Sequence, residues 1–203
     1  MKIARILYPV HTLGPGERLA IWTYGCNHGC PGCANPELWN PKRVKETDES
    51  SLRAYLEQLK GRGPIEGITI TGGDPFLDRD SLKNLLGIVR EYSEDILVYT
   101  GFLFDEIKKE NKAEEILADI AVLIDGPYIE AQNKGHVLKG SENQTIYYLK
   151  KRYEESYKKY IAENQGKYLV ENFPANGGVI SVGIHKPDFK QRMDEILLGG
   201  KNE

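Results

Sequence analysis

The sequence alternates between strand-like and helix-like segments, and this order restricts the chain to few folds. Apolar or β-branched runs at residues 19–24, 67–71, 96–99 and 120–124 have the character of buried strands. Amphipathic spacing predicts helices between them, one starting near Thr47, one over 82–89 and one over 105–117. Further along, the pattern predicts a helix over 146–162 and a strand over 178–183. Such alternation needs right-handed crossovers, which favours a mainly parallel sheet covered by helices.

Chain length narrows this α/β class. The chain has 203 residues and no Ser/Gly/Pro-rich linker, so we expect one domain over residues 1–203. A complete eight-unit barrel typically needs about 250 residues. We therefore predict a partial barrel of the (βα)6 type, with a curved, mainly parallel sheet and outer helices.

Polar turns follow each of the four predicted strands. A cysteine loop follows residues 19–24, Gly72-Gly73-Asp74 follows 67–71, Thr100 follows 96–99 and Asp125 follows 120–124. Ligands of parallel α/β proteins collect beyond the carboxyl ends of the strands. These segments are far apart in sequence, yet we expect them to meet in a single site.

The chain has only three cysteines, Cys26, Cys30 and Cys33, and all lie in one short loop. An odd number cannot form a closed set of disulfides, so this clustering favours a metal or redox role. Three thiolates on a four-iron cubane leave one iron open to a ligand from outside the protein. Two alternatives stay open at this point: a zinc site completed by His28 or His11, and a thiol redox pair of Cys30 and Cys33.

Charge and hydropathy exclude other classes of partner. The formal net charge is -3 and 28% of residues are charged, so no sequence-wide basic field exists to bind nucleic acid. No apolar run approaches the roughly 20 residues that span a bilayer, and His, Pro and Gly interrupt the N-terminal segment before a signal-peptide core develops. We expect a cytoplasmic protein without membrane or nucleic-acid partners.

Several segments in order resemble a known family. CNHGCPGC followed by ANPELW is similar to the radical S-adenosylmethionine (SAM) proteins that activate glycyl radical enzymes, in particular the activating proteins of anaerobic ribonucleotide reductases. The segments GPGERLAIWTYGC, TITGGDPF, LVYTGF, LIDGPYIE and KGSENQ extend the resemblance over roughly residues 1–150. The resemblance implies a 4Fe–4S cluster on Cys26, Cys30 and Cys33, SAM on its open iron, and a 5′-deoxyadenosyl radical released by electron transfer into SAM.

The resemblance also implies roles for residues around the cluster. The backbone near Gly32 and Ala34 is expected against SAM, while the Gly72-Gly73-Asp74 turn is expected to offer backbone carbonyls and a carboxylate to the SAM ammonium. Thr100 and Asp125 are candidates for contact with the ribose or a substrate peptide. Taken alone, a Thr after a strand is typical of a helix cap and an Asp before Gly-Pro is typical of a turn.

Three features depart from the family pattern. Gly32 stands where many radical SAM proteins have an aromatic residue, and Lys139 stands where the family often has Arg, which removes a planar bidentate donor. The chain also continues beyond the family-like core, and we expect residues 151–203 to pack on that core as an extension. The tyrosines at 153, 157 and 160 predict one buried helix face there.

Three functions follow as hypotheses. The first is an activase that places a radical on a glycine of a partner enzyme, most simply anaerobic ribonucleotide reductase, with electrons from a flavodoxin- or ferredoxin-type donor. The second is radical SAM chemistry on a small molecule or a ribosomal peptide. The third is a zinc-stabilised binding module without catalysis.

Overall fold

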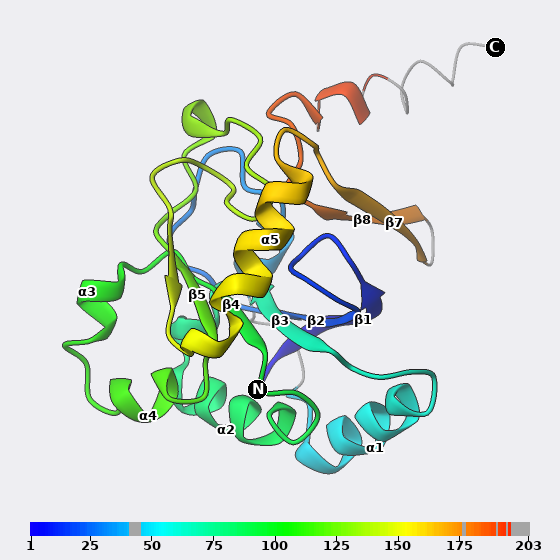
Figure 1. Ribbon diagram of the computed structural model, residues 1–203, viewed down its shortest axis with the longest axis vertical. Coiled ribbons are helices and arrows are strands. Elements are labelled where there is room, and N and C mark those ends of the chain that lie inside the picture. Colours follow the sequence, from blue (N-terminus) through cyan, green and yellow to red (C-terminus); the bar gives the residue numbers. More distant parts are fainter. Residues whose placement is uncertain (41–45, 176–177, 190, 194, 196–203) are drawn as a thin grey trace.

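Six strands form the central sheet of the computed structural model, which describes residues 1–40, 46–175, 178–189, 191–193 and 195 (Figure 1). The strand order follows the sequence, from β1 to β6. Strands β2 to β5 are parallel, and β1 and β6 pair antiparallel with their neighbours at the two edges. The strands are β1 Ile3–Val10, β2 Arg18–Thr23, β3 Gly67–Gly72, β4 Ile96–Tyr99, β5 Val122–Asp125 and β6 Thr145–Tyr148. The described sheet is therefore mainly parallel and open, and it is not a closed barrel.

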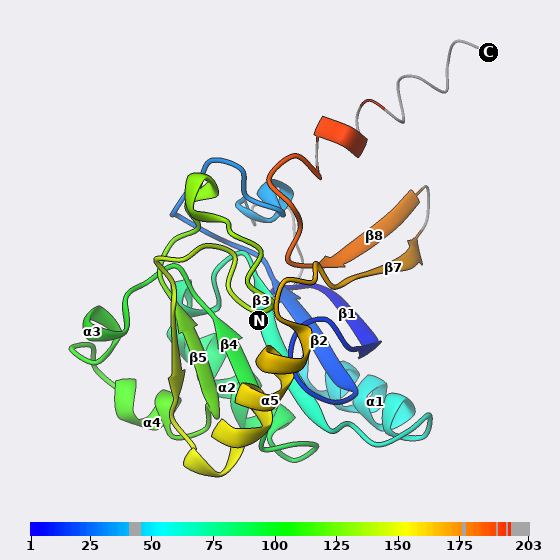
Figure 2. The same ribbon diagram turned by 45° about the horizontal axis from the view of Figure 1, so that its top comes forward.

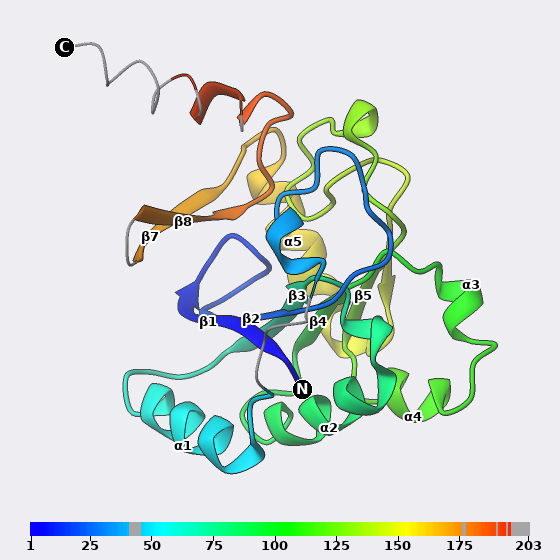
Figure 3. The same ribbon diagram turned by 180° about the vertical axis from the view of Figure 1, so that it is seen from behind.

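Helices cover both faces of this sheet. Helices α1, α2 and α4 lie side by side along one face, whereas α5 crosses the other (Figures 1 and 3). A separate two-stranded sheet of β7 and β8 follows α5. The bounds are α1 Glu49–Lys60, α2 Arg79–Val89, α3 Phe104–Ile107, α4 Ala113–Leu117, α5 Glu154–Asn164, β7 Val170–Ala175 and β8 Gly178–Gly183. Short 3-10 helices are η1 Pro36–Leu38, η2 Pro75–Leu77, η3 Glu130–Gln132 and η4 Lys151–Tyr153.

Successive side chains of a strand point to opposite faces of the sheet, which explains why helices pack on both faces. Ile68 and Ile70 of β3 pack with the leucines of α1 and α2 in the largest apolar cluster. Leu97 of β4 points to the opposite face and belongs to the cluster that contains Tyr157 of α5. Both faces of the central strands are thus buried, as expected for parallel strands with helices on each side.

Two of the predicted elements were wrong. The helix expected over 105–117 is two short helices, α3 and α4, because Lys112 adopts a left-handed conformation with φ 64° that a continuous helix cannot contain. The helix expected over 146–162 begins only at Glu154, because the β-branched and aromatic run Thr145–Tyr148 pairs with β5 as strand β6. Strands β1 and β7 were not predicted, whereas β4 and β8 have the expected bounds.

A buried ion pair lies at the amino ends of the parallel strands. Arg18, at the start of β2, is 0% exposed, and its Nη1 lies 2.9 Å from Oδ2 of Asp95, the residue before β4. Its other donors bind Thr69 Oγ1 at 2.7 Å and the Ile68 carbonyl at 2.7 Å. Gly67 leaves the space that Arg18 needs, because a Cβ there would lie 2.1 Å from the guanidinium.

Residues after 150 contact the core at several points. The Tyr157 hydroxyl donates to Asp95 Oδ1 at 2.7 Å, and the Tyr160 hydroxyl donates to the His11 carbonyl at 2.7 Å. Glu171 of β7 accepts from the His11 and Thr12 backbone at 2.7 and 3.2 Å. Helix α5 and the hairpin are therefore held against the first twenty residues of the chain.

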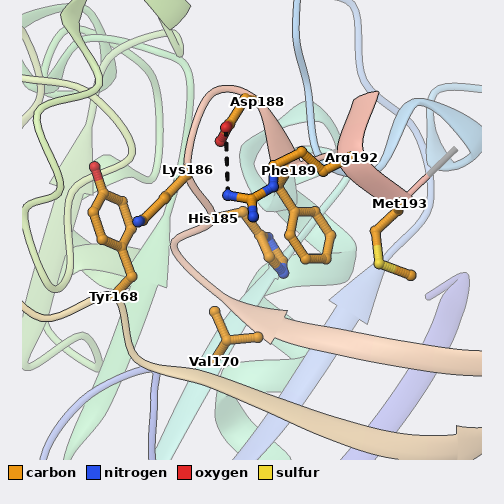
Figure 4. Close-up of a pocket in the computed structure, with 8 residues that line it drawn as sticks. All are labelled: Tyr168, Val170, His185, Lys186, Asp188, Phe189, Arg192 and Met193. Atoms are coloured by element: carbon orange, nitrogen blue, oxygen red, sulfur yellow. Dashed lines mark ion pairs between the residues drawn. The ribbon is translucent and has the colours of Figure 1, made fainter. Parts of the chain in front are cut away.

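A cavity of about 280 Å³ lies within this C-terminal part of the chain (Figure 4). It lies between β7 and the turn after β8, and its lining residues are Tyr168, Val170, His185, Lys186, Asp188, Phe189, Arg192 and Met193. The His185 ring packs on Phe189 with centroids 4.1 Å apart and hydrogen-bonds to Ser181 at 2.8 Å. The cysteine loop contributes no residue to this cavity.

Within the described ranges, no helix has the length and hydrophobicity to cross a bilayer.

Candidate metal centre

The cysteine loop leaves the carboxyl end of β2 and is closed at its root by its own backbone. The Gly25 N–H donates to the Leu38 carbonyl at 2.8 Å, and the Cys26 N–H donates to the Trp39 carbonyl at 3.2 Å. Leu38, which is 1% exposed, packs beside Trp22 and anchors the returning arm. The Asn-Pro-Glu-Leu-Trp segment therefore has a structural role, because it ends the loop on the core.

The three thiols lie along this loop, each half-buried and free. Gly25, Gly29 and Gly32 have φ of 99°, 59° and 75°, values that let the backbone curl tightly between the cysteines. Burial raises the pKa of the Cys26 thiol, and backbone N–H groups of His28 and Gly29 oppose this rise. The Asn35 N–H donates to Cys33 Sγ at 3.4 Å. Donors of this kind favour the thiolate form that binds metal.

The loop after β5 lies beside the cysteine loop, above the carboxyl ends of the parallel strands (Figures 2 and 3). Burial raises the pKa of the Cys30 thiol, and a backbone hydrogen bond from Tyr128 in that neighbouring loop opposes it. Gly32 and Ala34 are exposed. A Cβ on Gly32 would lie 2.6 Å from the Glu130 carboxylate, so the loop after β5 reaches the cysteine loop at this point.

The Gly72-Gly73-Asp74 turn is bound directly to the root of the cysteine loop. The Gly73 N–H donates to the Thr23 carbonyl at 2.8 Å, and the Asp74 N–H donates to the Gly25 carbonyl at 2.6 Å. A Cβ on Gly73 would lie 2.2 Å from the Gly25 carbonyl oxygen. A Cβ on Gly72 would lie 2.3 Å from the Thr23 nitrogen, so both Gly72 and Gly73 are required by the close approach of the two backbones.

Asp74 is the centre of a hydrogen-bond cluster at the ends of β3 and β4. Its side chain is 0% exposed. Oδ1 accepts from the Phe76 N–H and the Thr100 hydroxyl, each at 2.9 Å. Oδ2 accepts from the Gly101 N–H at 2.8 Å and lies 2.8 Å from His28 Nε2. The structure thus brings Thr100, Asp74 and the cysteine loop together.

Asp125, at the end of β5, has separate partners. Its carboxylate accepts from the Phe104 N–H at 2.8 Å and the Thr145 N–H at 3.2 Å, and so connects α3 to β6. It belongs to the same end of the sheet and does not join the Asp74 cluster.

The Gly140–Gln144 segment, for which the sequence predicted no chemistry, holds the loop after β5. The Asn143 amide donates to the Pro127 carbonyl and the Gln144 amide donates to the Gly126 carbonyl, both at 2.8 Å. The Ser141 hydroxyl accepts from the Ile129 N–H at 3.1 Å. These contacts fix the loop that borders Cys30.

The surroundings of the three cysteines bear on which metal group they could hold. Among the described residues, no three His, Cys, Asp or Glu side chains converge closely enough to hold one ion. The zinc alternative needs four ligands at about 2.0–2.3 Å from one centre. His28 is bound to Asp74, and His11 to Glu171 at 2.7 Å. Three thiolates on one loop with N–H donors nearby fit a cubane, which spreads its thiolates over separate irons.

Comparison with known proteins decides between a zinc site and an iron–sulfur cluster. Residues 12–147 match the model of a family described as a 4Fe-4S single cluster domain. The chain belongs to this family. A protein of Enterobacteria phage T4 is 32% identical over 146 residues, which span 70% of this chain and 90% of the phage protein. One from Pasteurella multocida is 35% identical over 148 residues, 69% of this chain and 93% of its own.

Both relatives are named anaerobic ribonucleoside-triphosphate reductase-activating protein, as is one from Haemophilus influenzae that is 34% identical over 151 residues. This 4Fe-4S family match ends at residue 147, before η4 and α5 begin. The matched region includes the cysteine loop, the Gly72–Asp74 turn and the Gly140–Gln144 segment. Sequence reasoning missed His28 as a partner of Asp74, because the spacing of the cysteines alone did not show where that ring points.

Proposed function

We propose that this protein is a radical SAM activase that places a glycyl radical on an anaerobic ribonucleoside-triphosphate reductase. One observation carries the proposal: three half-buried thiols share a loop at the carboxyl edge of parallel strands, in a chain of the 4Fe-4S single cluster family. The names of its relatives support the choice of partner.

In this proposal Cys26, Cys30 and Cys33 hold the cluster and leave its fourth iron for SAM. When bound, the reduced cluster would supply the one electron that divides SAM into methionine and a 5′-deoxyadenosyl radical, and this radical would become 5′-deoxyadenosine by taking the Cα hydrogen of a partner glycine. The chain's own contribution is to hold the thiolates and to border the ligand.

The remaining site residues line this edge. Gly72, Gly73 and Asp74 form the turn whose backbone carbonyls face the SAM ammonium in the proposal, and the backbone at Gly32 and Ala34 borders SAM from the cysteine loop. Thr100 and Asp125 border the ribose or the substrate peptide through the loops that their side chains hold.

The surface of this edge suits a protein substrate. Three of the large exposed apolar side chains follow three adjacent strands: Leu77 after β3, Leu103 after β4 and Ile129 after β5, exposed by 40%, 48% and 39%. Exposed apolar side chains are typical of surfaces that bind proteins when they form a patch, and all three follow strands at the end of the sheet where the proposal places the partner. A small-molecule substrate gains no support from this arrangement.

We also infer the finer architecture. The open sheet from β1 to β6 corresponds to a partial radical SAM barrel, and residues 1–203 form one domain with 151–203 as an extension on the core. Of this range, residues 41–45, 176–177, 190, 194 and 196–203 lie outside the described residues. The contacts of Tyr157 with Asp95 and of Glu171 with His11 support this reading. A flavodoxin- or ferredoxin-type protein is the proposed source of electrons.

The test is an anaerobic reaction of reconstituted protein with SAM, a strong reductant and an anaerobic ribonucleotide reductase. We expect a glycine-centred signal in electron spin resonance and 5′-deoxyadenosine in amounts that match the spins. A reductase in which the radical-bearing glycine is replaced by alanine is the control and gives no such signal. A fully loaded cluster that cleaves SAM without ever producing the partner signal would refute the proposal.

A further inference from the structure

The segment between Cys26 and Cys30 is tied to the core by one side chain. His28 Nε2 lies 2.8 Å from Asp74 Oδ2, and the His28 side chain is only 18% exposed. The ring meets Phe102 edge-on, with centroids 4.7 Å apart and an interplanar angle of 72°. A Cβ on Gly101 would lie 2.6 Å from the ring. The imidazole is therefore wedged into the ends of β3 and β4.

The Asp74 carboxylate is held in place by residues other than His28. The Asp74 carboxylate accepts from Phe76, Thr100 and Gly101 independently of the cysteine loop. These donors belong to η2 and to the end of β4, both of which pack on the core. Because several hydrogen bonds fix the position of the Asp74 carboxylate, its contact with His28 restrains the cysteine loop.

The backbone N–H groups beside this ring act on a cysteine. Those of His28 and Gly29 oppose the rise that burial causes in the pKa of the Cys26 thiol. Their direction depends on the conformation of residues 27–29, and the imidazole is the side chain of this stretch that reaches the core. Asn27 and Gly29, its neighbours, are exposed. Hydrogen bonds to cluster sulfurs tune reduction potential, and partners that orient metal ligands affect affinity.

We infer that His28 is a positioning residue: its hydrogen bond to Asp74 fixes the Cys26–Cys30 segment so that the N–H groups of His28 and Gly29 face the cluster sulfur. This inference rests on the proposed cluster at the three cysteines. It assigns the Asp74 side chain to the protein's own loop, and it leaves the backbone of the Gly72–Asp74 turn for SAM.

The test compares four variants of the reconstituted protein without SAM or reductase. His28→Ala removes the ring, and His28→Asn keeps an amide that is too short to reach Asp74. His28→Gln carries its amide nitrogen about where Nε2 lies. Asn27→Ala is the matched control, because Asn27 is an exposed neighbour in the same loop. The readouts are the rate of iron release to a ferrous chelator and the midpoint potential of the cluster.

We expect iron release about 10- to 100-fold faster in His28→Ala and His28→Asn, the range seen when partners of metal ligands are removed. The midpoint potential becomes more negative, because lost N–H donors no longer stabilise the reduced, more negative cluster. His28→Gln and Asn27→Ala stay near the wild type in both measurements.

Each contrary result is decisive. Wild-type rates and potential in His28→Ala would overturn the inference, and so would a His28→Gln variant as defective as His28→Ala. Circular dichroism of the iron-free variants separates loss of the cluster from loss of the fold, and an unfolded His28→Asn chain would assign His28 to global stability instead. Wild-type protein that binds no iron would count against the proposed function itself, so the two failures are distinguishable.

Discussion

Two buried aspartates occupy opposite ends of the parallel sheet and are satisfied in different ways. Asp95, before β4, is paired with the guanidinium of Arg18, a side chain with 0% exposure. Asp74, after β3, is held by backbone N–H groups, a hydroxyl and one imidazole. The amino end therefore neutralises its carboxylate with a fixed cation, whereas the carboxyl end relies on neutral donors and a histidine.

This difference suggests that the amino end of the sheet serves stability and the carboxyl end serves the chemistry of the site. At the amino end every group is buried and has a partner within the protein, so the network adds rigidity and offers nothing to a ligand. At the carboxyl end the thiols are half-buried, and the loop that carries them is held at its root and through His28. Substitutions at the two ends should consequently change different measured quantities.

The largest effect is expected at the carboxyl end. Cys30→Ala removes one of three cluster ligands, and we expect the iron content after anaerobic reconstitution to fall from about four per chain to below about one. The far-ultraviolet circular dichroism of the iron-free chain should not change, because Cys30 belongs to none of the apolar clusters. A Cys30→Ala chain that keeps a full iron complement would break the comparison.

The next effect is expected at the amino end. Arg18→Met leaves Asp95 buried without its cation, which costs about 3–5 kcal/mol of unfolding free energy. Urea titration of the iron-free variant and wild type measures the difference. Arg53→Met is the matched control: Arg53 pairs with Glu91 on the surface, and its loss should produce no measurable change. Equal losses in both variants would contradict the special role of the buried pair.

The smallest effect is also expected at the amino end, next to Asp95. Tyr157→Phe removes the hydroxyl that donates to Asp95 Oδ1 and leaves that oxygen with one partner fewer. We expect a loss of about 1–3 kcal/mol in the same urea titration, because a buried acceptor loses its donor. The iron content should equal that of wild type, since the substitution lies at the amino end. A loss of iron without a loss of stability would show that the two ends are coupled.

Much of the central sheet was predictable because its strands are continuous apolar runs that end in turn signals. The strand runs now called β2, β3 and β4 and the amphipathic leucines of α1 and α2 were found in this way. The polar residues after these strands were expected to converge, and Thr100 and Asp74 do so directly. Where both faces of a strand are buried, a short continuous apolar run bounded by turn residues is the signal that predicts it.

Other features depend on contacts between segments distant in sequence. Strand β6 was read as helix because its Ile-Tyr-Tyr run precedes a charged helical stretch, and only pairing with β5 separates the two. Arg18 gave no sequence signal, because a charged side chain at the start of an apolar strand is normally assigned to the surface. The direction of the His28 ring likewise depends on Asp74, which lies 46 residues away.

The contact between Gly73 and the Gly25 carbonyl has a consequence for protein engineering. A Cβ at position 73 would lie 2.2 Å from that oxygen, so the cysteine loop fits only against a turn of this shape. Residues 25–39 alone are therefore an incomplete module for grafting a cluster site onto another α/β scaffold. A recipient would have to receive the Gly72–Asp74 turn together with the loop, at the same spacing between adjacent parallel strands.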